Sequence, residues 1–204
     1  MPVLSVWGVG DSISQCSALV TDTVSSWGYR ACLDASIQTN PVVYANFGAA
    51  SQIATTYLAN ARATLAAGAP PPSVMVINPC SVNDITATPN TRIIESMRST
   101  AQQALQLARD YDIPAIIWFP ILPYNSLSGA SDLLRTALNT EMAAMAAVAG
   151  VTWMTFSSLG DGAAPERWVA AYNYTSDGIH PNETAIDTIM APVLLALLRS
   201  KRAQ

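Results

Sequence analysis

The sequence predicts an α/β fold in which helices wrap a five-stranded parallel sheet. Five short apolar runs alternate along the chain with longer segments whose apolar residues recur at helical spacing. Half of the 204 residues are hydrophobic and only 12% are charged, which favours a large core and argues against disorder. Because no repeat or change in composition divides the chain, we expect a single domain over residues 1–204.

The predicted elements follow in order along the chain. The expected strands are residues 3–9, 42–46, 74–78, 113–119 and 151–156. The expected helices are residues 13–27, 51–67, 89–110, 131–149 and 182–202. Thr88 is a candidate N-cap for the third helix, Gly68 and Gly150 should end the second and fourth, and Pro192 should kink the last.

Charge and hydropathy exclude two classes of partner. The net charge is −4, and the densest basic cluster, residues 199–202, suits a solvated helix end, so we expect no nucleic-acid partner. No apolar stretch reaches the roughly 18 uninterrupted residues of a membrane helix, so we expect no membrane span.

The N-terminus and the cysteines bear on the compartment. Met1 is followed at once by the first expected strand, without the basic, apolar and cleavage regions of a signal peptide. We therefore expect a cytoplasmic protein, or a mature or excised domain. The three cysteines, Cys16, Cys32 and Cys80, favour buried thiols, with a Cys16–Cys32 disulfide as the alternative.

Four polar clusters follow the expected strands. They are Gly10-Asp11-Ser12, Asn46-Phe47-Gly48, Ser81-Val82-Asn83-Asp84 and, after a long loop, Asp177-Gly178-Ile179-His180. Because ligands of open parallel sheets bind outside the carboxyl ends of the strands, all four fall on the predicted functional edge.

The clusters contain the parts of a serine hydrolase. Ser12 needs a base to take its proton, and His180 is the only histidine in the chain. Asp177, three residues earlier, can fold back to orient the imidazole. The backbone N–H groups of Ser12 and Gly48 and the carboxamide of Asn83 can donate to a developing oxyanion.

These residues resemble the four sequence blocks of the SGNH hydrolases, also called GDSL-type esterases, in order and over nearly the whole chain. The resemblance implies a flavodoxin-like three-layer α/β/α sandwich with strand order 2-1-3-4-5. It also implies Ser12 as nucleophile, His180 as base, Asp177 as its partner, and Ser12, Gly48 and Asn83 as the oxyanion hole. Members cleave esters and thioesters, including acetyl groups on carbohydrates, without a metal.

Two positions depart from the family pattern. Ile13 replaces the usual leucine, an apolar change of similar volume that should cost little. Ser81 stands where the third block usually has glycine, so the loop that presents Asn83 should be shaped differently and the width of the acyl pocket is in question.

Structural alternatives exist for each cluster. Asp177 and His180 could form a surface turn, Ser12 could be a helix N-cap, and Asn83 with Asp84 could form an Asx-turn. Asp84 is expected to be structural and Asp11 to be a turn or helix-start residue. One histidine and scattered cysteines do not suit a zinc site, so we expect no metal and no cofactor.

Aromatic residues indicate the substrate class. The loops after the fourth and fifth strands carry Tyr124, Trp168, Tyr172 and Tyr174 among polar neighbours, which suits a sugar better than a long acyl chain. We therefore expect a small ester or acetylated carbohydrate as substrate. The alternatives are a short-chain lipid esterase or thioesterase and, in a different class, a non-catalytic carbohydrate-binding module.

Overall fold

The computed structural model describes residues 3–15, 26–35, 41–156, 158–163, 166–173 and 177–202. Within these residues lies a five-stranded sheet of order β2-β1-β3-β4-β5, and every pairing is parallel. The strands are β1 (Leu4–Gly10), β2 (Val42–Gly48), β3 (Val74–Ile77), β4 (Ala115–Trp118) and β5 (Thr152–Trp153). The predicted fold class and the strand order implied by the resemblance are confirmed.

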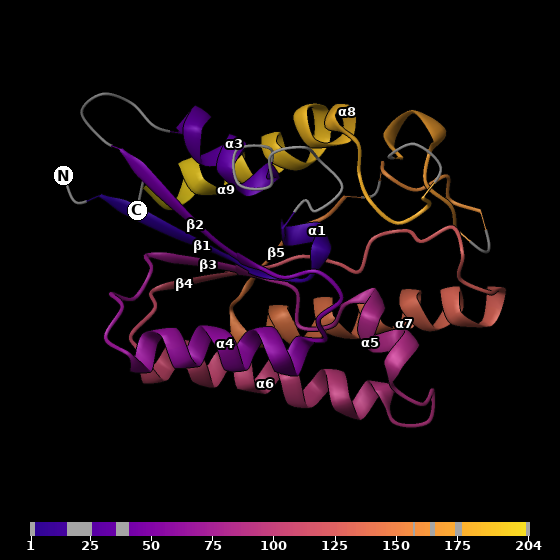
Figure 1. Ribbon diagram of the computed structural model, residues 1–204, viewed down its shortest axis with the longest axis horizontal. Helices are drawn as coiled ribbons and strands as arrows, with labels where there is room; N and C mark the ends of the chain where they lie inside the picture. Colours follow the sequence, from indigo (N-terminus) through magenta and orange to yellow (C-terminus); the bar gives the residue numbers. More distant parts are fainter. Residues whose placement is uncertain are drawn as a thin grey trace.

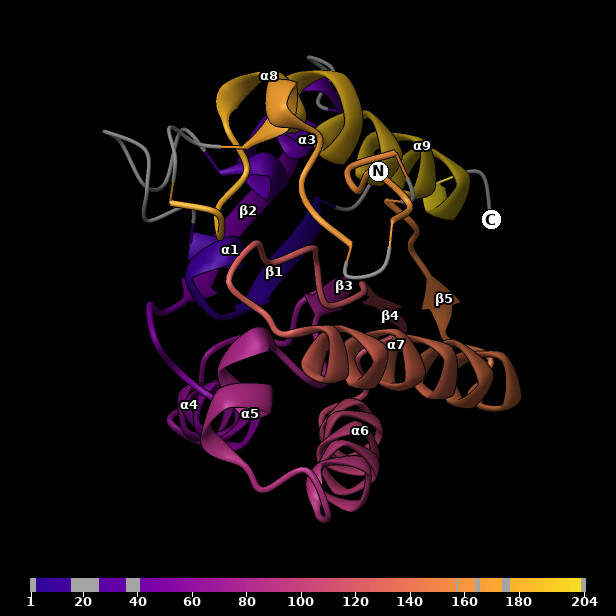
Figure 2. The ribbon, with the colours of Figure 1, turned by 90° about the vertical axis from the view of Figure 1, so that its right-hand side faces the viewer.

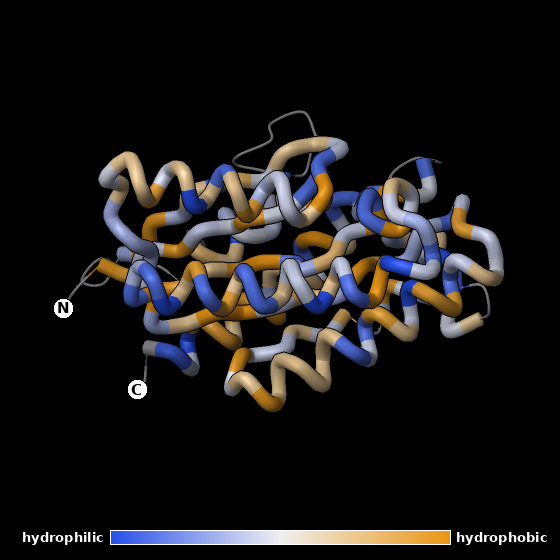
Figure 3. Tube along the Cα trace, turned by 90° about the horizontal axis from the view of Figure 1, so that it is seen from below, coloured by the Kyte–Doolittle hydropathy of each residue, from blue (hydrophilic) through white to orange (hydrophobic). Residues whose placement is uncertain are grey.

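Helices cover both faces of the sheet (Figure 1). One face packs against α3 (Trp27–Ala35) and α9 (Ala191–Arg202), and the other against α4 (Ala54–Ala66), α6 (Ile93–Asp110) and α7 (Gly129–Ala149). Alternate strand residues face the two layers, so the strands read as largely apolar runs. Hydrophilic and hydrophobic residues alternate along the helices seen in Figure 3, as amphipathic helices require.

The first predicted helix is wrong at its end. The structure has α1 (Ser12–Gln15) directly after β1, but Trp27 begins α3 rather than ending a helix, and residues 16–25 lie outside the described part. The hydroxyl of Ser26 accepts the N–H of Tyr29 at 3.1 Å, so Ser26 caps a new helix. Cys80 is a buried free thiol and Cys32 is buried, whereas Cys16 is not described, so a Cys16–Cys32 pair stays untested.

The third predicted helix begins later than expected, and a short helix precedes it. α5 (Val82–Ala87) occupies the segment that the sequence assigned to a loop, and Thr88 follows its end instead of capping α6. Thr88 precedes Pro89 and is extended, with φ −108° and ψ 133°, because proline disfavours the helical region in the residue before it. α6 therefore starts only at Ile93.

The C-terminal helix is interrupted upstream of Pro192. α8 (Glu183–Ala185) runs into the π-helical turn η2 (Ile186–Met190) and then into α9. The N–H of Ala191 bonds the carbonyl of Ile186, five residues back. A proline within a helix removes one N–H and crowds the preceding turn, and here the helix is widened immediately before it. No helix in the described part of the chain is long and apolar enough to cross a membrane.

Candidate functional site

The strand ends bring the four sequence clusters to one edge of the sheet. Figure 2 looks onto this edge, where α1, α5 and the segment before α8 surround the ends of β1 and β3. Gly10 and Gly48 pair in register at the ends of β1 and β2. Ser12 is the first residue of α1 and is 8% exposed. Its N–H has no partner inside the helix, as at any helix N-terminus, and the helix dipole favours negative charge there.

Asp177 and His180 form a hydrogen-bonded pair. His180 Nδ1 lies 2.7 Å from Asp177 Oδ2, and Asp177 Oδ1 accepts the N–H groups of Ile179 at 2.8 Å and His180 at 3.0 Å. Partial burial raises the pKa of Asp177, but these three bonds outweigh it and hold the pKa below its usual value. An ionised Asp177 favours the tautomer with the proton on Nδ1, which leaves Nε2 as an acceptor. His180 Nε2 is buried and has no hydrogen-bond partner among the described residues.

A narrow cavity connects the neighbours of the predicted catalytic residues. It is lined by Asp11 and Ile13, on either side of Ser12, by Val82, next to Asn83, and by Ile179, next to His180. Its free space of about 10 Å³ is that of a single water molecule. The structure thus brings the serine, asparagine and histidine segments together around one small space.

Asp11 is the most perturbed carboxyl at this edge. It is 2% exposed, and its Oδ1 accepts the N–H of Ile13 at 2.9 Å, as expected for a turn at a helix start. Burial raises its pKa to about 6; Asp84 adds to the rise, while the Ile13 bond and the charge of His180 oppose it. The charge of His180 therefore acts directly on the residue that precedes Ser12.

Gly48 lies in close contact with the backbone of α1. A Cβ on Gly48 would lie 2.4 Å from the backbone nitrogen of Gln15, so only glycine fits between β2 and this helix. The N–H of Gly48 donates to Asn46 Oδ1 at 2.9 Å. Donation from Gly48 to a substrate oxygen requires this bond to break, and its oxyanion role stays a prediction. Three residues on, Ser51 has φ 60°, a strained conformation for a residue other than glycine.

Asn83 sits in a turn held by Ser81 and Asp84. Asn83 Nδ2 donates to the carbonyl of Gln52 at 3.1 Å, so its other amide hydrogen remains for a ligand. Asp84 Oδ2 accepts both the N–H and the hydroxyl of Ser81, and the same carboxylate bonds the N–H of Ala54 at the start of α4. Asp84 is structural, as expected, and the serine that replaces the family glycine completes a capping box for α5.

The predicted aromatic residues do not gather on one surface. Tyr124 lines the narrow cavity, Tyr172 packs partly buried against the core, and Trp168 is 4% exposed within the core. Tyr174 lies outside the described residues. The burial of Trp168 disfavours direct contact with a sugar, and the substrate-binding role of the other aromatics stays a prediction.

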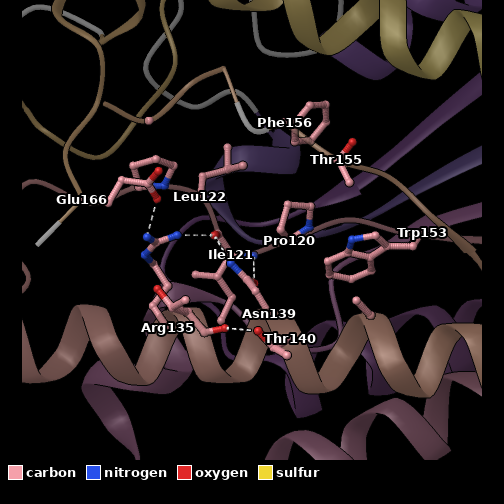
Figure 4. A pocket seen from close by; sticks show the side chains of 14 residues that line it. Pro120, Ile121, Leu122, Arg135, Asn139, Thr140, Trp153, Thr155, Phe156 and Glu166 are labelled. Atoms are coloured by element: carbon pink, nitrogen blue, oxygen red, sulfur yellow. Dashed lines mark hydrogen bonds and ion pairs between the residues drawn. The ribbon is translucent and has the colours of Figure 1, made fainter. Parts of the chain in front are cut away.

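A larger cavity of about 340 Å³ lies between α7 and the segments that follow β4 and β5 (Figure 4). Arg135 bonds Asp132, Glu166 and the carbonyl of Ile121, and Asn139 bonds both backbone groups of Ile121. These polar groups are already paired inside the protein, so they hold the segment after β4 in place. Ile121 also lines the narrow cavity, so the segment after β4 separates the narrow cavity from the larger one.

Sequence reasoning did not reveal the contacts of Asn125, which lies on the same connection after β4. The backbone N–H of Asn125 donates to the carbonyl of Gly178 within the Asp177–His180 turn. The side-chain oxygen of Asn125 accepts the backbone N–H of Trp168. No local pattern marks it, because its partners are distant in sequence. In the described part of the chain no three His, Cys, Asp or Glu side chains group as metal ligands.

No family model matches the sequence, and no curated protein matches it. Solved structures match it over nearly its whole length. A family two carbohydrate esterase from Clostridium thermocellum, in complex with cellohexaose, matches with TM-score 0.71 at 16% identity, over 100% of this chain and 66% of that chain. The fold is that of the SGNH hydrolases.

Other neighbours agree with this fold. A member of the lipolytic G-D-S-L family from Veillonella parvula matches with TM-score 0.69 at 19% identity, over 96% of this chain and 97% of that chain. The psychrotrophic esterase EstA from Pseudoalteromonas sp. matches with TM-score 0.68 at 14% identity, over 98% and 99% of the two chains. Identities this low establish similarity of fold alone.

Proposed function

We propose that the protein is a metal-independent serine ester hydrolase. The observation that carries this proposal is the orphaned Nε2 of the only histidine. Its other ring nitrogen is held 2.7 Å from Asp177, while Nε2 is buried beside the serine segment without a partner among the residues that the structure describes. Burying an unpaired acceptor costs about 1–3 kcal/mol. The proposed role of Nε2, which is to accept a proton during turnover, explains why no structural hydrogen bond from the described residues occupies it.

The proposed reaction has two steps. Ser12 Oγ attacks the ester carbonyl carbon as its proton passes to His180 Nε2, and the imidazolium then gives that proton to the leaving alcohol. Water attacks the acyl-Ser12 intermediate with His180 again as base, which releases the acid and restores Ser12. Asp177 remains ionised and stabilises the imidazolium.

The oxyanion is proposed to bind where α1, β2 and α5 meet. The N–H of Ser12 and the remaining amide hydrogen of Asn83 would donate to it. Gly48 joins them in the proposal if Asn46 releases its N–H. Each such donor contributes about 10²–10³ in rate when the others are in place.

The proposed substrate is an ester of a small acyl group, with an acetylated carbohydrate as the favoured class. The narrow cavity beside Asp11 and Ile179 has space for about one water molecule, which suits an acetyl group and excludes a long chain in this conformation. One structural neighbour is a carbohydrate esterase in complex with cellohexaose. A short-chain lipid ester or thioester is the second candidate.

The experiment combines turnover with labelling. The protein is incubated with p-nitrophenyl acetate and its longer-chain homologues, with acetylated sugars, and with a fluorophosphonate probe whose site is located by mass spectrometry. We expect acetyl ester turnover and a label on Ser12, both absent in Ser12→Ala. Folded protein that shows neither would instead support a non-catalytic carbohydrate-binding module.

A further inference from the structure

The turn that carries Asp177 and His180 is fixed by partners outside it. The N–H of Asn125 donates to the carbonyl of Gly178 at 2.8 Å, and beyond the turn the N–H of Asn182 donates to the carbonyl of Tyr172 at 2.9 Å. Gly178 has φ 69°, and a Cβ there would lie 2.7 Å from the Cβ of Asn125. Asn125 therefore both bonds the turn and packs against it at van der Waals distance.

Asn125 is itself held by its side chain. Its Oδ1 accepts the backbone N–H of Trp168 at 2.9 Å. The side chain of Trp168 is buried in the core, with 4% of its surface exposed. Four residues before Asn125, the backbone of Ile121 is bonded by Arg135 and Asn139 of α7. A chain of contacts thus runs from a long helix and a core tryptophan through Asn125 to the turn that presents the imidazole.

We propose that Asn125 is a positioning residue for His180, an inference that rests on the proposed esterase function. Its side chain fixes the backbone of Asn125, and that backbone fixes Gly178 two residues before His180. Nε2 must meet the serine proton within hydrogen-bond distance. Because a displacement of about 1 Å can cost 10²-fold in rate, the acceptor bond to Trp168 sets the rate without touching substrate.

Two substitutions separate this role from a purely structural one. Both variants keep the backbone N–H and the Cβ that lies against Gly178; Asn125→Ala removes the acceptor for the backbone N–H of Trp168, whereas Asn125→Asp keeps an acceptor oxygen. With p-nitrophenyl acetate we expect Asn125→Ala to lower kcat by about ten- to a hundredfold and to leave KM nearly unchanged. Asn125→Asp should retain most of kcat.

Ser128→Ala is the matched control. It lies on the same connection and removes one side-chain-to-backbone bond, from Ser131 N–H to Ser128 Oγ at 3.2 Å, at the start of α7. Losing this cap costs about 1 kcal/mol of stability and should leave kcat unchanged. Urea denaturation of each variant shows whether stabilities are comparable. If Asn125→Ala does not fold, Asn125→Ser, whose hydroxyl is too short to reach Trp168, takes its place.

The single histidine gives a readout that is independent of activity. In proton NMR of the full chain, the Nδ1–H of His180 should give one low-field signal from its bond to Asp177. We expect this signal to broaden or vanish in Asn125→Ala and to persist in Asn125→Asp and Ser128→Ala. An Asn125→Ala protein with unchanged kcat and an unchanged signal overturns the proposal, as does an equal loss of kcat in Ser128→Ala. If the parent protein turns over no ester, the proposed function fails, while the imidazole signal still tests the positioning of His180.

Discussion

Replacing Asp11 with asparagine should stabilise the protein, and the gain should depend on pH. Burial raises the pKa of Asp11 from 3.8 to about 6. Since one pKa unit corresponds to about 1.4 kcal/mol, ionising this carboxyl costs the folded state about 3 kcal/mol more than the unfolded state. Asparagine is isosteric and keeps an oxygen to accept the Ile13 N–H, but it has no charge to bury.

The sign of the pH effect follows from proton binding. Between about pH 4 and pH 6 the folded protein holds a proton on Asp11 that the unfolded chain has released, so the contribution of this group to stability falls as pH rises. Below that window the protonated acid and asparagine should be nearly equivalent. Above it, Asp11→Asn should be more stable than the parent by about 3 kcal/mol.

Urea denaturation followed by tryptophan fluorescence measures this difference at about pH 4 and about pH 7.5. Taking the difference between the two proteins cancels the titration of groups that do not interact with Asp11. A difference in free energy of unfolding that stays constant across this range would refute the assignment of a raised pKa to Asp11. A fall in kcat for Asp11→Asn is also expected, because the ionised carboxyl attracts the protonated His180.

Four further predictions concern the site directly. His180→Ala should abolish ester turnover at every pH, since no other imidazole exists in the chain; a mutant that keeps its pH–rate profile would exclude His180 as base. Asp177→Asn should lower kcat but retain more of it than Ser12→Ala, and an Asp177→Asn protein with the parent's single-turnover rate would contradict the role of Asp177 as partner of the imidazole. Asn83→Ala should lower kcat more than it raises KM, as steady-state kinetics with p-nitrophenyl acetate can test. Gly48→Ala should cost about 1–3 kcal/mol of stability by pressing on α1, and urea denaturation indistinguishable from the parent would contradict the close packing.

The sheet was predictable because its signal is local. The strands lie between two layers of helices and read as largely apolar runs, as β3 does with every residue buried, and parallel order follows from the alternation of strands and helices. The helix boundaries were less accessible. From the sequence, Trp27 could end one helix or begin another. In the structure it begins a helix, because the Ser26 hydroxyl caps the helix start. The pattern Ser81-x-x-Asp84 is a helix-start box that could have signalled α5, but the sequence-based prediction for this segment is a loop or an Asx-turn.

Some residues of the candidate site could be predicted from the sequence, and others could not. Ser12, Asp177 and His180 stand in short clusters whose chemistry can be read from neighbouring residues. The partners of Asn125 cannot be read in this way, since Trp168 lies 43 positions away and the contact forms only once the strands are ordered. Trp168 and Tyr124 looked alike in sequence as aromatics in polar loops, yet one is in the core and the other lines a cavity.

Several groups at the edge formed by the carboxyl ends of the strands destabilise the folded protein, and this is evidence that the chemistry takes place there. Asp11 is buried with a raised pKa, His180 Nε2 is buried with no partner in the described part of the chain, and Ser51 holds a backbone conformation that favours glycine. Each feature destabilises the fold by itself, and strained or unsatisfied groups persist where function retains them. An unpaired group alone does not mark the site, because the indole nitrogen of Trp118, the last residue of β4, also has no hydrogen-bond partner among the described residues although its side chain packs in the core. If the costs at this edge serve catalysis, removing one should raise stability and lower turnover together, which is the paired outcome expected for Asp11→Asn.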